Sequence, residues 1–338
     1  MKTNIKKILE EYNGLGIKEQ IDYDKFYLYS IITHSTAIEG STVTEVENRL
    51  LFDEGIGSQK PLMEQLMNLD LKAAYERAFE YAKNGVDYSI PLLCGLSALV
   101  MKNTGSEYST MVGDFSAAKG ELRLLNVSAG FGGRSYLSYQ KVPGRTKEFC
   151  QWINNERAII DKNDIESIYL LSFEAHYRLA CIHPWADGNG RMSRLVMNMI
   201  QREFGVIPSI VRKERRKQYI ESLVQSQEAE SSAKFLDFMF RHHCRNLQKQ
   251  IDEFKQSIDD EGEGMNKTSQ KTSQKTLRKT SQKILKLITE DAYMTTQTMA
   301  DTIGIDRRNI ARNIKKLQEQ GVIRRVGPDK GGYWEIIN

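Results

Sequence analysis

Apolar side chains recur at helical spacing along most of the first 258 residues. This pattern predicts a bundle of helices that share one core. The segment 165–182 is apolar over so much of its circumference that we expect it to be a central, buried helix. Asn163 precedes this segment as a predicted N-cap, with Glu166 three residues later. The predicted helices are 24–39, 62–81, 90–101, 165–182, 191–205 and 235–254.

Two stretches depart from the helical pattern. Between Gly113 and Val142 the chain is rich in glycine, and apolar and polar residues alternate at about 131–142 as in a short β-hairpin. Residues 259–279 contain an acidic patch followed by Lys-Thr-Ser-Gln repeats, with too few apolar side chains to bury a core, and they predict a flexible linker. The predicted domains are N-terminal helices at 1–110, a core at 111–258 and a second domain at 280–338.

The second domain has the pattern of three short helices followed by two strands. The first helix begins near Ile284, the second is capped at Thr295, and the third ends at Gly321. Two predicted strands follow, at 322–326 and 333–337. This order resembles a winged-helix domain. Its third helix carries a basic face that suits DNA phosphates in a major groove and equally suits a solvated protein-docking surface, so both readings stay open. The basic residues are Arg307, Arg308, Arg312, Lys315 and Lys316.

Composition places the chain among ordinary soluble proteins. The 338 residues are 40% hydrophobic and 27% charged, with a net charge of +4. No apolar run approaches the roughly 18 residues of a membrane span, and the first residues lack the apolar core of a signal peptide. We therefore expect a cytoplasmic protein without a membrane partner. The four cysteines lie far apart, which predicts neither a zinc site nor a disulfide framework.

The stretch 183–191 reads HPWADGNGR and joins the central helix to the next one. A loop that enters a helix leaves backbone N–H groups unpaired, and the helix dipole adds partial positive charge, so this junction favours an anion. Gly188 and Gly190 can adopt the positive φ of a backbone nest around a phosphate. Arg191 and Arg194 are predicted to bind separate phosphates of a di- or triphosphate.

Two further residues of this loop supply chemistry. Asp187 suits Mg²⁺, which takes one or two carboxylates together with phosphate oxygens. His183 is a candidate general base for a hydroxyl nucleophile, a role worth about 10²–10⁴-fold in rate. Each of these residues alone is more typical of a turn or a structural position. Their conjunction in one short loop indicates a site for a phosphate chain.

The loop resembles the signature of the Fic-domain family, H-P-F-x-D/E-G-N-G-R-x-x-R, with Trp185 in place of the phenylalanine. The resemblance extends over most of residues 24–240. It implies a mainly α fold, namely a Fic-type helical bundle with a β-hairpin flap, joined here to the small α+β winged-helix domain. It also implies transfer of AMP from ATP to a Ser, Thr or Tyr hydroxyl of a protein, with Mg²⁺ required.

The resemblance also implies a role for each residue of the loop. His183 is then the base, and Asp187 binds the metal. The turn Gly188-Asn189-Gly190 surrounds the α- and β-phosphates, Arg191 binds the phosphate chain and Arg194 binds the γ-phosphate.

The predicted helix 24–39 ends in a second motif of the same family. A carboxylate in the last turn of a helix meets the negative end of the dipole, so Glu39 is expected to have a cationic partner. Ser35, Glu39 and Gly40 match the inhibitory motif S/T-x-x-x-E-G/N of Fic proteins. The resemblance implies that Glu39 pairs with Arg194 in the place of the γ-phosphate, so that ATP binds unproductively. In some relatives this glutamate instead positions a water that removes AMP, and that alternative stays open.

Further nucleotide contacts are implied by position relative to these motifs. The resemblance places the flap at about 131–142, over the active site, where it would hold a substrate segment by strand addition. This stretch lacks the Pro-Pro pair that is common in relatives. The implied contacts to ATP or substrate are Gly133, Arg134, Ser135 and Tyr136 in the flap, with Tyr219 and Gln227 at the adenosine.

Two functions of different classes follow from these features. The favoured one is an autoinhibited adenylyltransferase that modifies a hydroxyl of a target protein or of itself. The other is a DNA-binding transcriptional regulator whose Fic core senses nucleotide. ATP and Mg²⁺ are the expected co-substrate and metal, and a target protein, DNA and a second copy in a homodimer are the partners considered. The sequence leaves open the target, the group transferred and the oligomeric state.

Overall fold

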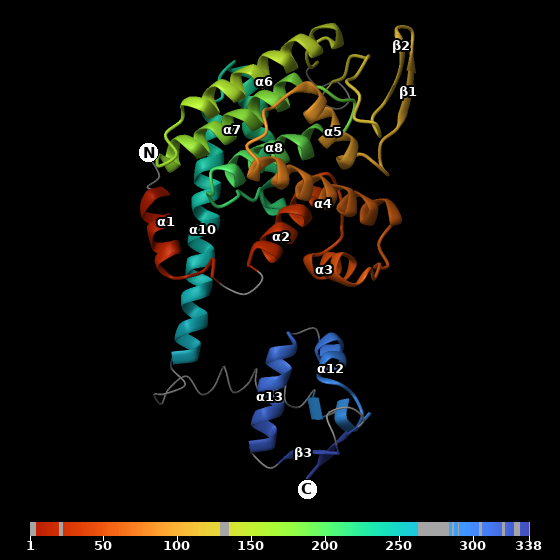
Figure 1. The fold of residues 1–338 in the computed structure, drawn as a ribbon, viewed down its shortest axis with the longest axis vertical. Helices are drawn as coiled ribbons and strands as arrows, with labels where there is room; N and C mark the ends of the chain where they lie inside the picture. The colour runs from red at the N-terminus through yellow and green to blue at the C-terminus, as the bar shows by residue number, and fades with distance from the viewer. Residues whose placement is uncertain are drawn as a thin grey trace. The chain divides into compact units, whose positions relative to one another are not determined.

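The computed structural model describes residues 5–19, 23–128, 135–262, 284–285, 287–289, 291–303, 306–319, 322–327 and 332–337. The chain divides into two compact units, Met1–Ile251 and Asp252–Asn338, and the division falls within the long helix α10. Both units are mainly helical, and each has one two-stranded antiparallel sheet in its described part (Figure 1). The mainly α fold class predicted from the sequence is confirmed.

Six helices of the first unit lie where helical spacing predicts them, and four more, α1, α3, α6 and α9, lie outside the predicted ranges. Figure 1 draws this unit in red to cyan. Its elements are α1 (Ile5–Gly14), α2 (Tyr23–Ile38), α3 (Glu45–Glu54), α4 (Leu62–Lys83), α5 (Ile90–Val100), β1 (Glu107–Thr110), β2 (Gly113–Ser116), α6 (Val142–Ile159), α7 (Ile165–Ile182), α8 (Asn189–Glu203), α9 (Arg216–Glu228) and α10 (Ala233–Gly262).

The centre of the first unit is the pair α7 and α8. These two helices pack most extensively on each other, and α8 also contacts α4, α5 and α2, so it is buried along most of its length. Helix α7 spans the predicted residues, but its N-cap is Asp164 and not Asn163. The Asp164 carboxylate accepts the Ser167 hydroxyl at 2.6 Å, whereas the backbone N–H of Asn163 donates to Asp161 outside the helix.

Helix α2 ends where the sequence predicts, at a glycine with left-handed backbone. Gly40 has φ +107°, which turns the chain away from the helix after Glu39. The next helix, α3, starts with a capping box in which the Thr44 hydroxyl accepts from the Glu47 N–H at 3.2 Å and the Glu47 carboxylate accepts from the Thr44 N–H at 2.8 Å. This short connection fixes α2 between α3, α4 and α8.

Of the hairpin predicted at 131–142, residues 131–134 lie outside the described residues, and 139–142 are helical, which corrects the predicted end of the hairpin. Its described residues include a turn of 3₁₀ helix at Tyr139–Lys141 and the start of α6, where Pro143 lies at the first helical positions and favours helix over strand. The segments 125–128 and 135–137, called here the two arms of the flap, lie against each other. Ser128 bridges Ser135 in antiparallel fashion, and the Tyr136 N–H donates to the Val127 carbonyl at 3.0 Å. A separate hairpin, β1 with β2, precedes the flap.

The second unit has the helices and strands predicted for a winged helix. They are α12 (Thr296–Ile303), α13 (Arg307–Glu319), β3 (Ile323–Val326) and β4 (Tyr333–Ile336). Strands β3 and β4 pair antiparallel, and the Thr295 hydroxyl accepts from the Thr298 N–H at the start of α12, which is the predicted cap. Its core contains Ile284, Leu287, Ile288, Met299, Ala300, Ile310, Ile314, Leu317, Ile323 and Trp334.

The predicted linker at 259–279 falls outside the described residues beyond Gly262, and its first four residues form the end of α10. Through the part of the chain that the structure describes, no helix combines the length and the apolar character needed to cross a membrane.

Candidate active site

The loop between α7 and α8 turns on two residues with left-handed backbone. His183 has φ +53° and Gly188 has φ +82°. Trp185 anchors the loop, because its side chain is fully buried and its Nε1 donates to the Gly120 carbonyl at 3.0 Å. Asn189 closes the turn by accepting the Trp185 N–H at 3.1 Å and donating to the Trp185 carbonyl at 2.9 Å. The sequence HPWADGNGR therefore folds into a turn fixed on both sides.

Gly190 serves a different purpose from the one predicted. It lies in the first turn of α8 without a positive φ, whereas Gly188 has the positive φ expected. A Cβ at position 190 would lie 2.5 Å from Oε1 of Glu39 and 3.1 Å from Nη1 of Arg194. Glycine is therefore needed here because it lets another group approach the start of the helix closely.

The imidazole of His183 is neutral at pH 7. Burial lowers its pKa to about 4, a hydrogen bond with the Ala180 backbone opposes this shift, and the charge of Arg123 adds to it. The ring stacks on Tyr136, with centroids 3.7 Å apart and an angle of 16° between the planes. Because the bond to Ala180 engages one edge of the ring, the other nitrogen can accept a proton, as a general base must.

Arg191 carries buried donors without a partner. The residue is 3% exposed, yet its Nε and Nη1 make no hydrogen bond to any residue that the structure describes. Its Nη2 lies 3.1 Å from the sulfur of Met101 and 3.7 Å from Oδ2 of Asp187. Burial lowers the pKa of Arg191, but an arginine remains charged at neutral pH. A buried cation with unpaired donors at a helix start favours an anionic ligand.

All three guanidinium nitrogens of Arg194 donate to groups of the same chain. Its Nη2 donates to Oε1 of Glu39 at 2.6 Å and to the Ser35 carbonyl at 3.0 Å, and its Nε donates to the Ser35 hydroxyl at 2.8 Å. On the other side Nη1 donates to the Tyr219 hydroxyl at 3.3 Å. The predicted contact between Glu39 and Arg194 is confirmed, and Ser35 of the same motif supports it.

The ion pair between Glu39 and Arg194 is intact at neutral pH. Burial by itself would raise the pKa of Glu39, but the charge and hydrogen bond of Arg194 outweigh it, and the pKa lies below the usual value. Burial likewise opposes the charged form of Arg194, while Tyr219 and Glu39 raise its pKa. Arg216 from α9 donates Nε to the Ile38 carbonyl at 2.7 Å, so it satisfies a backbone acceptor at the end of α2.

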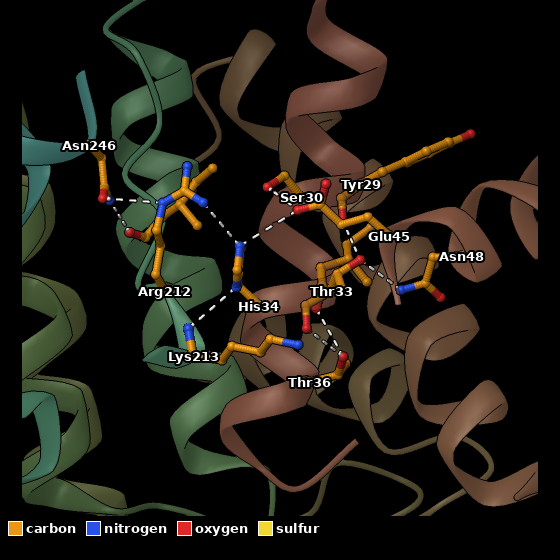
Figure 2. Close-up of polar contacts among 12 residues, drawn as sticks. Tyr29, Ser30, Thr33, His34, Thr36, Glu45, Asn48, Arg212, Lys213 and Asn246 are labelled. Atoms are coloured by element: carbon orange, nitrogen blue, oxygen red, sulfur yellow. Dashed lines mark hydrogen bonds and ion pairs between the residues drawn. The ribbon is translucent and has the colours of Figure 1, made fainter. Parts of the chain in front are cut away.

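Contacts on two sides hold the middle of α2 (Figure 2). On one side, Asn48 of α3 donates Nδ2 to the Thr33 hydroxyl at 2.8 Å. On the other side, Nδ1 of His34 accepts the backbone N–H of Lys213 at 3.3 Å, and Nε2 lies 3.5 Å from Nη1 of Arg212. These contacts immediately precede Ser35 in the helix, and they fix its last turn against α8.

A cavity of about 460 Å³ lies between the segment 135–137 and the helices α7 and α9. Its wall includes Tyr136, whose ring stacks on His183, together with Ser135 and Gln227. Tyr219 lies elsewhere: it is 1% exposed, and its hydroxyl lies 2.9 Å from Nε2 of His176. Of the two residues predicted to touch the adenosine, Gln227 lines this cavity and Tyr219 is buried beside Arg194. The predicted contacts Gly133 and Arg134 lie outside the described residues.

Sequence reasoning missed two buried residues of this region. His176 supports Tyr219 behind Arg194, and Arg123 contacts the backbone of His183. The sequence does indicate a special position for Arg123, because this charged residue lies between two leucines, Leu122 and Leu124, in a glycine-rich stretch. It gives no such indication for His176, since a histidine on the apolar face of a helix is usually structural.

Asp187 is the residue that fits a metal bound together with phosphates. Its side chain is 61% exposed, and its Oδ1 accepts the Gly188 N–H at 2.6 Å. Mg²⁺ commonly takes one or two carboxylates and completes its shell with phosphate oxygens and water. Among the described residues there is no cluster of three or more His, Cys, Asp or Glu side chains for a metal. The four cysteines are free.

The basic face of the second unit lies along α13. Arg307, Arg308 and Lys315 are exposed there, and Asp306 caps the helix by accepting the Arg308 N–H at 2.6 Å. The other two predicted basic residues, Arg312 and Lys316, belong to the same helix, but their side chains lie outside the described set. A single helix therefore presents at least three cations to solvent.

Comparison with known families agrees with this division. Residues 87–201 match the Fic/DOC family, and residues 277–324 match winged helix-turn-helix DNA-binding domains. Protein adenylyltransferase fic-1 of Caenorhabditis elegans is 25% identical over 266 residues, which cover 77% of this chain and 48% of that protein. The chain thus spans about half the length of such curated relatives, or less.

Solved structures show the same fold. A Fic domain containing signaling protein from Bacteroides thetaiotaomicron has a TM-score of 0.61 at 21% identity, covering 75% of this chain and 97% of that one. A Fic family protein from Desulfovibrio desulfuricans G20 has a TM-score of 0.56 at 18% identity, covering 100% of this chain and 97% of that one. This chain therefore carries a Fic/DOC domain over residues 87–201, followed by a winged helix-turn-helix domain over residues 277–324.

Proposed function

We propose that the chain is an autoinhibited protein adenylyltransferase, which transfers AMP from ATP to a Ser, Thr or Tyr hydroxyl of a target protein or of itself. The observation that carries the proposal is the 2.6 Å contact between Arg194 and Glu39, because it puts a carboxylate where the γ-phosphate is expected. Relatives named protein adenylyltransferases in Caenorhabditis elegans and Drosophila melanogaster support the class of reaction.

In the proposed reaction, the neutral imidazole of His183 takes the proton of the incoming hydroxyl. The hydroxyl oxygen attacks the α-phosphorus, the bond from that phosphorus to the bridging oxygen breaks, and pyrophosphate leaves with the electron pair. The start of α8 and the unpaired donors of Arg191 bind the phosphate chain. Asp187 would hold Mg²⁺, which neutralises phosphate charge when it is bound.

Inhibition follows from the hydrogen bonds of Arg194. Its Nε and Nη2 are used by Ser35 and Glu39, and its Nη1 is used by Tyr219. A γ-phosphate would therefore find the guanidinium occupied and would face the Glu39 carboxylate at close range. Because like charges repel strongly where water is scarce, the triphosphate cannot take the productive pose until Glu39 moves away.

The test compares the wild type, Glu39→Gly and the double variant Glu39→Gly/His183→Ala. Each is incubated with ATP labelled on the α- or the γ-phosphate, and the protein is then analysed by mass spectrometry for modified peptides. We expect α-label and the mass of AMP on the Glu39→Gly protein, about 10²-fold more than on the wild type, and none on the double variant. Equal labelling of the wild type and Glu39→Gly contradicts the inhibitory role.

The same experiment separates transfer from removal of AMP. Modified Glu39→Gly protein is mixed with unlabelled wild-type protein, and the label is followed over time. Stable label supports an inhibitory role for Glu39 alone. Loss of label that depends on Glu39 in the added protein assigns this glutamate to removal of AMP instead.

A second function, binding of duplex DNA by the winged-helix unit, is favoured by the exposed cations of α13. Lys and Arg side chains that contact phosphates make affinity fall steeply with salt. The measurement is fluorescence anisotropy of a labelled duplex at several salt concentrations. Binding that is insensitive to salt, or absent at low salt, would favour a protein-docking role.

A further inference from the structure

Arg123 is a buried cation whose contacts are all to backbone carbonyls. The residue is 1% exposed, and burial lowers its pKa. The described part of the chain gives it no carboxylate for an ion pair, unlike Arg194 with Glu39 or Arg157 with Glu203. Burying an arginine costs free energy unless its N–H groups have hydrogen-bond acceptors. The acceptors of Arg123 therefore indicate its role.

The guanidinium joins three segments of the chain. Its Nε donates to the His183 carbonyl at 2.8 Å, its Nη1 donates to the Leu125 carbonyl at 2.7 Å, and its Nη2 donates to the Leu137 carbonyl. Leu125 and Leu137 belong to the two arms of the flap, on either side of the bridge between Ser128 and Ser135. A planar fork of five N–H donors suits such a junction, whereas an ammonium group does not.

The backbone of Arg123 reinforces this junction, because its N–H donates to the Pro184 carbonyl at 3.0 Å. Two consecutive carbonyls of the loop, at 183 and 184, are therefore held by one residue. His183 has φ +53°, a conformation that costs free energy in a residue other than glycine. The hydrogen bond from Nε of Arg123 to the His183 carbonyl fixes the peptide that follows this residue, and so it stabilises the positive φ.

The same junction fixes the ring that covers the imidazole. Tyr136 immediately precedes Leu137, and its ring stacks on His183 with centroids 3.7 Å apart. The carbonyl of His183 and the flap arm behind Tyr136 are thus bonded to one guanidinium. A shift of the flap would move the Tyr136 ring and release the His183 backbone together.

We propose that Arg123 is a positioning residue for the candidate catalytic histidine: His183 keeps its reactive orientation only while one guanidinium binds the carbonyls of His183, Leu125 and Leu137 together. The proposal rests on the function proposed above. Arg123 itself touches neither nucleotide nor acceptor.

The test uses Arg123→Met, which keeps the apolar stem, and Arg123→Lys, which keeps the charge, both in the Glu39→Gly background. Arg157→Met is the matched control, because Arg157 is also buried and multiply bonded but lies in α6 and binds Glu203. We expect both Arg123 variants to lower kcat for AMP transfer about 10²-fold, as displacement of a catalytic group by about 1 Å does. The KM for ATP should change less than threefold, and Arg157→Met should leave kcat unchanged.

A second readout does not depend on transfer. The titration of His183 is followed by NMR of protein with labelled histidine, and the resonance is assigned with His183→Ala. In the wild type burial holds the pKa of His183 at about 4. In Arg123→Met the bond that holds Leu137 is lost, so the neighbouring Tyr136 ring covers the imidazole less firmly, and a nearby cation is removed; we therefore expect the pKa of His183 to rise toward the usual 6.5. In Arg157→Met it should stay where it is.

The outcomes separate this inference from the function on which it rests. If Glu39→Gly transfers no AMP but the His183 titration moves only in the Arg123 variants, the coupling stands and the proposed reaction fails. If Arg123→Met lowers the melting temperature as Arg157→Met does and leaves both kcat and the titration unchanged, the coupling is refuted. Should Arg123→Met fail to fold, the pKa of His183 is measured in Arg123→Lys instead, because an ammonium group cannot bond three carbonyls in the same way. An unchanged pKa and an unchanged kcat in that variant would refute the coupling.

Discussion

The two units of this chain place their candidate functional residues in opposite ways. In the Fic unit Arg191 and Arg194 are 3% and 2% exposed, and Arg194 is held by side chains from other helices. In the winged-helix unit Arg307, Arg308 and Lys315 stand exposed along the single helix α13. A buried site depends on exact distances among distant segments, whereas an exposed basic face depends on the sum of its charges.

The units differ equally in their histidines. All five histidines of the chain lie in the first unit, and burial lowers the pKa of each. The second unit has none. The first unit is therefore expected to respond to moderate acid through groups that the second unit lacks.

The largest expected effect is on transfer by the Fic unit. His183→Ala in the Glu39→Gly background removes the general base, so AMP transfer should fall about 10²–10⁴-fold or more. DNA affinity of the same protein should not change. Labelled ATP and fluorescence anisotropy measure the two activities side by side. Transfer that survives in this variant would remove His183 from the mechanism.

The next effect concerns the winged-helix unit. Replacing Arg307, Arg308 and Lys315 by alanine should weaken duplex binding about 10²-fold at 0.15 M salt and reduce the slope of log affinity against log salt by about 3. Single replacements should each give part of this loss, because exposed charges act nearly independently. AMP transfer by the Glu39→Gly form should be unaltered. A loss concentrated in one residue would indicate a specific contact instead of a summed charge.

A smaller effect tests the histidine contrast. Burial lowers the pKa of His243 to about 3 in the folded chain. In the unfolded chain this histidine has its usual pKa of about 6.5 and is protonated below that pH, whereas in the folded chain it stays neutral. Stability from this group is complete above pH 6.5 and is lost as the pH falls toward about 3. When the pH is lowered from 7.5 to 5, the free energy of unfolding should therefore fall by about 1–2 kcal/mol less in His243→Phe than in the wild type. Urea unfolding at the two pH values measures the difference, and equal losses would contradict the burial argument.

The smallest effect concerns the support of α2. Asn48 is fully buried and donates to Thr33 and Asn68, both at 2.8 Å. Asn48→Ala should lower the free energy of unfolding by about 1–2 kcal/mol and, by loosening α2, raise basal AMP transfer about threefold. Asn163→Ala, at an exposed position before α7, serves as the control with neither effect. Unchanged basal transfer in a destabilised Asn48→Ala would show that α2 is not the element that limits activity.

The sequence predicted most helices of the first unit, and all described elements of the second, because helical and strand spacing is local. It failed where local spacing misleads. The segment 139–142 alternates as a strand does, but Pro143 begins α6 there. Gly190 reads as a turn residue, yet it is helical and leaves room for Glu39. Tyr219 is implied by the resemblance as an adenosine contact, and only the structure shows that it is buried with its hydroxyl against Arg194.

The sequence by itself determined the kind of site: a histidine, a carboxylate and two arginines in one loop that enters a helix, with a motif ending in Glu39. Only the tertiary structure decided which of these groups meet. Glu39 and Arg194 are 155 residues apart in sequence, and Arg123 and His183 are 60 apart. Contacts over such separations, and the burial that sets the pKa of His183, follow from packing of the whole unit, which no local pattern of residues encodes.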